Sequence, residues 1–261
     1  MSPRTAATLA VWLVSSAAAA ANLTAEEIVA KNVAARGGLD AWRKVGTMVW
    51  LGHVQSAHAP VPSMQFKLEQ KRPNKTRLQI NARTDKSMRV FDGLHGWKLR
   101  SGHGRPDIQP FSPDEIKFAQ AGQGIDGPLI DYAAKGNSVA LEGVDEIGGR
   151  KAYHLNVRLS KGGNEHAWVD TETYLDVRYD RLADGALRRV SAIYSDYRTV
   201  EGLQIPFVIE TGSGPGTTPD RLQIETVVLN VPLDDSTFAN PAAPHQRSRI
   251  RSSAPRGSAV R

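Results

Sequence analysis

The chain has 261 residues, of which 40% are hydrophobic and 23% charged, and it contains no cysteine. This composition predicts one globular domain with end segments, and the lack of cysteine excludes disulfides, thiolate metal sites and cysteine nucleophiles. Arg4 and five arginines after position 241 account for the formal charge of +6, so the body has no basic excess and nucleic acid is not an expected partner.

Residues 1–21 have the plan of a secretory signal peptide. Arg4 gives a positive start, Ala6–Val14 is apolar, and Ala19-Ala20-Ala21 fits the small-residue cleavage signal. We expect export to the periplasm with cleavage near Ala21, the alternative being an uncleaved N-terminal anchor. Because the chain has no cysteine, we expect no lipid anchor on it.

Capping signals predict helices in the body, residues 22–241. Thr24–Glu27 has the spacing of a capping box, and Gly37-Gly38 supplies the residues that end a helix. Ser112–Glu115 repeats the box, with proline at the first helical position. A further short helix is expected over Pro128–Ala134.

Most of the remaining body alternates apolar and polar residues, which is the period of a β-strand with one buried face. The apolar sets are Met64/Phe66/Leu68, Leu78/Ile80, Tyr153/Leu155/Val157/Leu159, Leu203/Ile205/Phe207/Ile209 and Leu222/Ile224/Thr226/Val228. The turn signals between strands are Arg72-Pro73-Asn74, Asp92-Gly93, Gly148-Gly149, Gly162-Gly163, Asp184-Gly185 and Glu201-Gly202. Closely spaced strands with such turns predict a mainly β fold, a single antiparallel sheet of roughly ten or eleven strands.

Two segments lack the pattern of regular structure. Gly212–Pro219 is rich in glycine and proline and is expected to be a loop between the last two strands. Residues 242–261 form an arginine-rich tail without apolar material, which we expect to be disordered. The tail either contacts anionic membrane headgroups or has no role.

The apolar face of so large a sheet must be buried, and the few predicted helices are too small to cover it. Either the sheet fills its own interior, or it curls around a cavity that the helices cover and a ligand occupies. The alternation alone does not decide between a filled interior and a cavity.

A series of segments resembles the periplasmic outer-membrane lipoprotein-sorting family, the LolA/LolB-like carriers. It comprises Tyr194–Arg198, Val200–Phe207, Ile224–Ser236, Phe91–Trp97 and Asp126–Tyr132. The resemblance implies a strongly curved sheet, an incomplete β-barrel, with a helical lid over an apolar cavity. It also implies a carrier of lipid acyl chains or of lipoprotein cargo, in transient contact with a membrane or a membrane-protein partner.

The resemblance makes the apolar strand faces candidate cavity walls. These residues are Met64, Phe66, Leu68, Leu78, Ile80, Tyr153, Leu155, Val157, Leu203, Ile205, Phe207, Ile209, Leu222 and Ile224. The candidates for the inner face of the lid are Ile28, Val29, Ile116, Phe118, Leu129, Ile130 and Tyr132.

No catalytic or metal signature accompanies these segments. Seven histidines are present without the spacing of a metal site, so we expect surface histidines and no metal or other cofactor. Asp92, Asp126, Asp131 and Asp170 lie in turn or helix-start contexts, where aspartate is common. We expect a carrier that is not an enzyme. The alternatives are an envelope sensor that binds a lipoprotein or protein partner with the same fold, and a hydrolase on an all-β scaffold.

Overall fold

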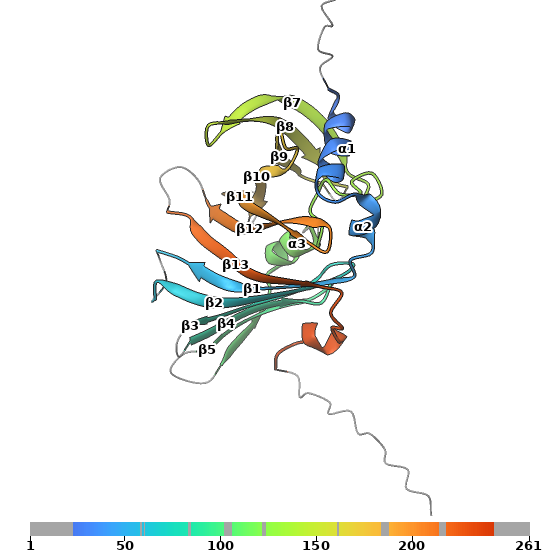
Figure 1. Cartoon of the computed structure of the whole chain (residues 1–261). Coiled ribbons are helices and arrows are strands. Elements are labelled where there is room, and N and C mark those ends of the chain that lie inside the picture. The colour runs from blue at the N-terminus through green and yellow to red at the C-terminus, as the bar shows by residue number, and fades with distance from the viewer. Residues whose placement is uncertain are drawn as a thin grey trace, which may run out of the picture.

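Thirteen antiparallel strands form one sheet in the part of the chain that the structure describes (Figure 1). The structure is a computed structural model that describes residues 23–242, apart from 58, 60, 83–84, 102–105, 122–123, 161, 184–187 and 214–217. The expected signal peptide and the arginine-rich tail beyond residue 242 lie outside the described residues, as do residues 214–217 of the loop expected at 212–219.

The sheet consists of two meanders that meet at its centre. The first meander runs through β1 (Thr47–Gln55), β2 (Ser63–Lys71), β3 (Lys75–Ala82), β4 (Asp85–Phe91), β5 (Gly96–Ser101) and β6 (Asp107–Pro110). The second runs through β7 (Ser138–Ile147), β8 (Arg150–Arg158), β9 (Asn164–Asp170), β10 (Asp176–Ala183), β11 (Arg188–Val200), β12 (Leu203–Gly212) and β13 (Asp220–Leu229). The strand order is β6-β5-β4-β3-β2-β1-β13-β12-β11-β10-β9-β8-β7, so β1 pairs with β13, and β6 and β7 are the two edges.

The capping signals place two helices as predicted. In α1 (Ala25–Ala35) the Glu27 N–H donates to Thr24 Oγ1 at 3.2 Å, and the Thr24 N–H donates to the Glu27 carboxylate at 2.8 Å. In α3 (Pro113–Ala121) Ser112 and Glu115 exchange the same two bonds, at 3.2 and 2.8 Å.

Other expectations are corrected by the structure. The expected helix over Pro128–Ala134 is wrong: the segment is a run of turns, because Gly127 and Asp131 both have positive φ, 76° and 54°, which interrupts a helix. The sheet has more strands than the roughly ten or eleven expected. The short helix α2 (Leu39–Arg43) and the 3-10 helix η1 (Asp235–Phe238) were not predicted.

The two faces of the sheet differ in what they bury. On the concave face, strand register brings Trp50, Leu68 and Leu78 side by side. On the convex face of the same strands, the buried carboxylate of Glu69 forms ion pairs with Lys67 and Arg77, each at 2.7 Å.

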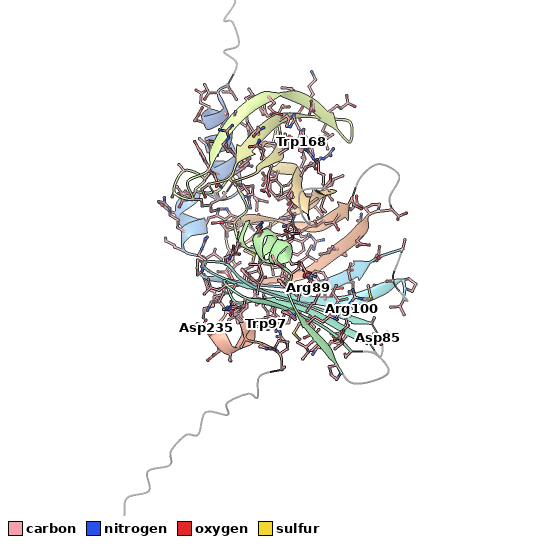
Figure 2. All side chains as sticks on the ribbon, turned by 180° about the vertical axis from the view of Figure 1, so that it is seen from behind. Asp85, Arg89, Trp97, Arg100, Trp168 and Asp235 are labelled. Carbon is pink, nitrogen blue, oxygen red and sulfur yellow. The ribbon has the colours of Figure 1, made fainter. Side chains whose placement is uncertain are left out.

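Small elements cover parts of both faces. The first helix, α1, covers the concave side of β8 and β9, where Ile28 and Val29 join one apolar cluster with Leu155 and Val169. On the convex side, η1 covers β4 and β5 with Phe238, which is fully buried. Figure 2 labels Trp97 and Asp235 where η1 and the sheet meet. Among the described residues, no helix is long and apolar enough to cross a membrane.

Candidate ligand cavity

The chain crosses the hollow of the sheet once, between its two edges. β6 ends at Pro110 on one edge, and β7 begins at Ser138 on the other. The 111–137 segment must therefore pass over the concave face, and it carries α3, which lies inside the curl of the sheet in both views (Figures 1 and 2). The topology thus creates the lid that the resemblance implied.

Ion pairs fasten the start of α3 to the first meander. Glu115 accepts from Arg89 on β4 at 3.0 Å and from Lys98 on β5 at 3.1 Å; Figure 2 labels Arg89 next to α3. Although burial opposes the charge on Glu115, the Ser112 N–H, Lys98 and Arg89 together lower the pKa of this carboxyl to about 2. Glu115 therefore stays ionised, and the attachment persists, at any ordinary pH.

Different contacts hold the rest of α3. Phe118 lies under the guanidinium of Arg181 on β10, with the guanidinium carbon 4.3 Å from the ring centroid. The Asn74 side-chain amide, in the turn between β2 and β3, donates to the Ala119 carbonyl at 2.9 Å. The lid helix thus contacts both meanders.

The concave face beneath the lid carries apolar side chains that the protein itself covers only in part. They belong to neighbouring strands at the centre of the sheet and pack against the main core cluster. They are Trp50, Met64, Leu68, Leu78, Ile80, Ile209 and Leu222. A half-covered apolar surface inside a curved sheet is typical of a ligand-binding hollow.

A cavity of about 210 Å³ lies at one end of this surface. Its apolar wall includes Trp50, Leu68, Ile205 and Ile209, and its polar wall includes the residues Arg36, Asp176, Arg178, Tyr179, Tyr194 and Tyr197. Pockets for drug-sized ligands measure roughly 300–1,000 Å³. A long acyl chain would therefore also need the half-covered surface beneath the lid.

A buried ion pair organises the polar wall. Arg36, just after α1, contacts Asp176 at the start of β10 at 3.1 Å, and the Asn32 amide donates to the same carboxylate at 3.1 Å. Burial raises the pKa of Asp176, while Arg36 and Asn32 oppose the rise. Tyr197 donates from its hydroxyl to the Asp176 carbonyl at 2.9 Å. Burial also raises the pKa of Tyr194 to about 12, so that this hydroxyl stays protonated.

Three polar atoms of cavity-lining residues have no hydrogen-bond partner among the described residues. They are Trp50 Nε1, Tyr179 Oη and Arg36 Nε. Buried polar groups are nearly always paired, since an unpaired one costs about 1–3 kcal/mol. The wall thus contains two N–H donors and one hydroxyl that lack an internal partner and are themselves shielded from solvent.

The structure distributes the fourteen sequence-predicted wall residues among three settings. The residues that line the cavity are Leu68, Ile205 and Ile209. Those on the half-covered concave surface, besides Leu68 and Ile209, are Met64, Leu78, Ile80 and Leu222. The rest pack in the main core (Phe66, Leu203, Phe207, Ile224) or in the cluster beneath α1 (Tyr153, Leu155, Val157).

The residues predicted for the inner face of the lid fall into two groups, one on α3 and one in the packed core clusters. Ile116 and Phe118 lie half-buried on α3. The others are part of the packed protein: Ile28, Val29, Leu129 and Tyr132 in the cluster beneath α1, and Ile130 in the main core.

Sequence reasoning missed the polar wall. Tyr194 and Tyr197 are three apart, and regular alternation would place them on opposite faces. Asp196, which lies between them, has a positive φ of 53° that departs from extended backbone, although the β11–β12 register is the same on both sides of it. Both tyrosines line the cavity. The alternation carried no signal for this irregular backbone position.

Two of the four aspartates stabilise turns, as predicted. Asp92 accepts from two backbone N–H groups of its own turn, and Asp170 does the same. Asp126 differs, because it is buried between Arg72 and Lys135, at 2.6 and 2.7 Å. Asp131 is held by Arg43 at 2.8 Å.

The expectation of scattered surface histidines fails for one pair. His154 and His166 lie side by side on the convex face, beside Glu142. The two histidines are twelve residues apart in the sequence but are diagonal neighbours across the β8–β9 hairpin. The turn signal at Gly162-Gly163 predicts this hairpin and could have revealed their proximity.

An open, curved antiparallel sheet with a lid segment over a partly apolar hollow is a ligand-cavity fold. Among solved structures, the chain is similar to a LolA superfamily protein from Nitrosomonas europaea, with TM-score 0.54, 13% identity, and coverage of 84% of this chain and 98% of that one. It is also similar to a DUF1329 family protein from Desulfovibrio piger, with TM-score 0.53, 14% identity, and coverage of 82% and 97%. A third similar structure is a domain assigned as an outer membrane lipoprotein-sorting protein from Vibrio parahaemolyticus, with TM-score 0.51, 11% identity, and coverage of 81% and 94%.

These similarities show that the chain has the fold of the LolA superfamily, as the resemblance in its sequence predicted. No family model and no curated protein sequence matches the chain.

Proposed function

We propose that this protein is a periplasmic carrier for a lipid or a lipid-modified protein, acting in outer-membrane lipoprotein sorting or in lipid transport. The observation that carries the proposal is the half-covered apolar surface beneath the lid, continuous with the cavity. Burying an acyl chain there contributes roughly 0.8 kcal/mol per CH₂, so one chain gives useful affinity without any specific motif.

The polar wall of the cavity supports an amphiphilic cargo rather than a plain hydrocarbon. Trp50 Nε1, Tyr179 Oη and Arg36 Nε lie at the end of the apolar surface and have unused hydrogen-bonding capacity. Ester, amide or phosphate oxygens next to an acyl chain would accept from such donors. In this arrangement the chain lies under α3 and the head of the lipid lies against β10 and β11.

The direct test is native mass spectrometry of the protein purified from the periplasm, followed by solvent extraction of what it carries. A bound lipid or lipopeptide would support the carrier and identify the cargo class. A bare protein that also fails to bind fluorescent fatty-acid probes would contradict the carrier and direct the search to a protein partner.

A matched pair of variants tests the location of the chain-binding surface. Leu78→Gln makes the concave surface polar, whereas Leu51→Gln changes a leucine that is 38% exposed and lies on the convex side opposite Lys67. We expect Leu78→Gln to weaken fatty-acid binding by about tenfold, the equivalent of one to two methylenes, and Leu51→Gln to leave it unchanged. Equal effects of the two substitutions would place the chain elsewhere.

A further inference from the structure

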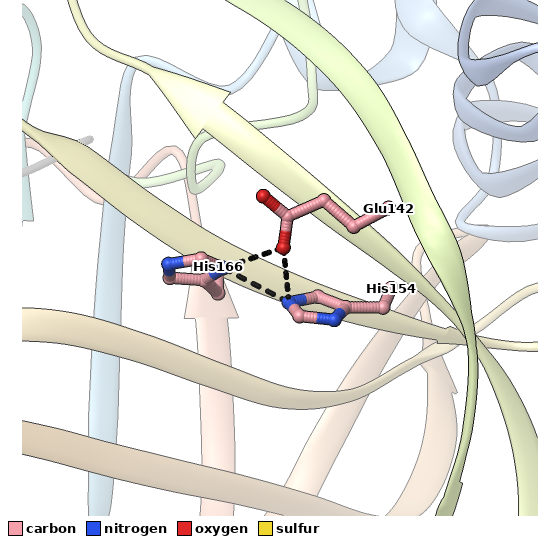
Figure 3. Close-up of side chains that lie close together, drawn as sticks. All are labelled: Glu142, His154 and His166. Atoms are coloured by element: carbon pink, nitrogen blue, oxygen red, sulfur yellow. Dashed lines mark hydrogen bonds and ion pairs between the residues drawn. The ribbon is translucent and has the colours of Figure 1, made fainter.

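Three potential metal ligands converge on the convex face of the second meander, the face opposite to the cavity. Glu142 lies on β7, His154 on β8 and His166 on β9, so three neighbouring strands contribute one residue each (Figure 3). The neighbouring Leu155 and Ala167 point the other way, into the cluster beneath α1. None of the three ligand residues lines the cavity.

A β-bulge brings the carboxylate into the group. The β7–β8 register shifts between Leu141 and Gly143, which leaves Glu142 as the extra residue without a cross-strand partner. Bulges redirect side chains and are frequent next to functional sites. Here the extra residue reaches over His154.

The three ligand atoms have the mutual spacing of a tetrahedral site. His154 Nε2 lies 2.9 Å from His166 Nδ1 and 3.2 Å from a Glu142 carboxylate oxygen, and His166 Nδ1 lies 3.5 Å from the same oxygen. Bonds of about 2.1 Å at tetrahedral angles place ligand atoms about 3.4 Å apart. Small side-chain shifts would therefore fit one ion.

Neighbouring groups hold two of these ligands in place. Asp145 lies 3.2 Å from His154 Nδ1 and so favours the tautomer that leaves Nε2 free to coordinate. The Asn156 amide donates to the other carboxylate oxygen of Glu142 at 2.8 Å. Trp168 stacks on the His154 ring, with centroids 4.4 Å apart, and donates to Asp145 at 2.8 Å. Such carboxylate–histidine partners are the usual second layer of a metal site.

The charges around the group favour a cation. Glu142 and Asp145 contact the histidines without an arginine partner in the ion pairs of the described residues. The nearby Arg178 and Arg189 are directed to Asp180, at 2.7 and 3.8 Å. The carboxylates of this patch thus outnumber its guanidinium groups.

We propose that Glu142, His154 and His166 bind one divalent transition-metal ion of the zinc type, with the fourth position open to water or a partner. Two imidazoles and one carboxylate form a ligand set that suits zinc and not calcium or magnesium, which prefer oxygen ligands. The Glu142 side chain is 38% exposed, so an ion can reach the site from solvent.

The test is titration of the full, untagged chain with zinc sulfate by calorimetry, and with cobalt as a spectroscopic probe. We expect one equivalent to bind, with the intense visible absorption of tetrahedral cobalt. Glu142→Gln and His154→Gln should each raise the Kd for zinc at least about tenfold, and Asp145→Asn about tenfold. Absence of binding, or octahedral cobalt spectra, would overturn the proposal.

A matched control separates this site from ordinary histidine chemistry. His53 on β1 forms an ion pair with Glu225 at 2.7 Å, and this pair contains one histidine where the proposed site contains two. We expect His53→Gln to leave the zinc affinity unchanged. Circular dichroism without metal shows whether His154→Gln folds. If it does not fold, the zinc affinity of Glu142→Gln tests the proposal instead, because an exposed residue at a bulge tolerates substitution. Wild-type affinity in Glu142→Gln would overturn the proposal.

Discussion

Arg181 on β10 lies over the ring of Phe118 on the lid helix, with its guanidinium carbon 4.3 Å from the ring centroid. The ion-pair partners of Glu115, three residues earlier on the same helix, belong to β4 and β5 in the other meander. One short helix therefore connects two parts of the sheet that lie far apart in strand order. We expect that movement of α3 away from the sheet would break at least one of these two contacts.

Glu115→Gln should loosen the lid. Glutamine keeps the capping bond to the Ser112 N–H but loses the charge that attracts Arg89 and Lys98. We expect faster hydrogen exchange in residues 113–121 and faster uptake of a fatty-acid probe. Asp114→Asn is the control, because it removes an exposed charge from the same helical turn. The same acceleration in both variants would mean that the ion pairs do not hold the lid.

The lid contact should also depend on acidity. The pKa of Glu115 is about 2 in the folded protein, compared with an ordinary value of 4.5. A lowered folded-state pKa stabilises the protein above the unfolded value, and this stabilisation is lost as the pH falls from 4.5 towards 2. Its size is about 1 kcal/mol, since water screens the pairs. In urea unfolding, wild type and Glu115→Gln should differ at neutral pH and converge in acid; a constant difference would contradict this assignment.

The buried ion pair of the cavity wall predicts a large effect from removing only one partner. Arg36→Met leaves the Asp176 carboxylate buried without its countercharge, which should cost about 3–5 kcal/mol of unfolding free energy at neutral pH. Because the folded-state pKa of Asp176 is already raised, the deficit should shrink as the pH falls and the carboxyl takes up a proton. The double variant Arg36→Met/Asp176→Asn should recover most of the loss. No recovery would show that Arg36 acts mainly through its other contacts.

Two tyrosines of the same cavity should respond oppositely to loss of their hydroxyls. Tyr197→Phe removes the bond to the Asp176 carbonyl and should destabilise the protein by about 1 kcal/mol. Tyr179→Phe removes a buried hydroxyl that has no partner among the described residues, and should raise the stability by up to about 1 kcal/mol. Thermal unfolding measures both effects. A destabilised Tyr179→Phe would imply that its hydroxyl is already bonded in solution.

Tyr179 also offers a test of cargo orientation. If its hydroxyl contacts the head of an amphiphile, Tyr179→Phe should weaken binding of a phospholipid while leaving binding of a long-chain alkane unchanged. Equal affinity of wild type and variant for the phospholipid would place the head group elsewhere.

The strands and caps could be predicted because their signals are local. The alternation Met64/Phe66/Leu68 and the capping box at Thr24–Glu27 each depend on residues within a few positions. The turn at Glu201-Gly202, with φ of 48° and 85°, likewise lies where its residues predict a hairpin. Such local features fixed the fold class without knowledge of the strand order.

The candidate sites could not be predicted in the same way, because they depend on register and on bulges. The extra residue at Glu142 and the positive φ at Asp196 each disturb the regular alternation of side chains between the two faces, and neither interrupts the sequence pattern visibly. A second difficulty is that the alternation does not distinguish packed apolar residues from those on the half-covered surface. Leu155 and Leu78 look alike in the alternation, yet one is fully buried beneath α1 and the other is half-covered beneath the lid.

The pairing of β1 with β13 has a consequence for how the molecule forms. Each meander is built from hairpins between consecutive strands, whose contacts close quickly because the intervening loops are short. The central pairing instead joins Met48 to Leu229 across nearly the whole body. During synthesis the two halves can form only separate sheets until β13 emerges. The hollow and its lid therefore come into existence in the last step, after nearly the entire chain has been delivered.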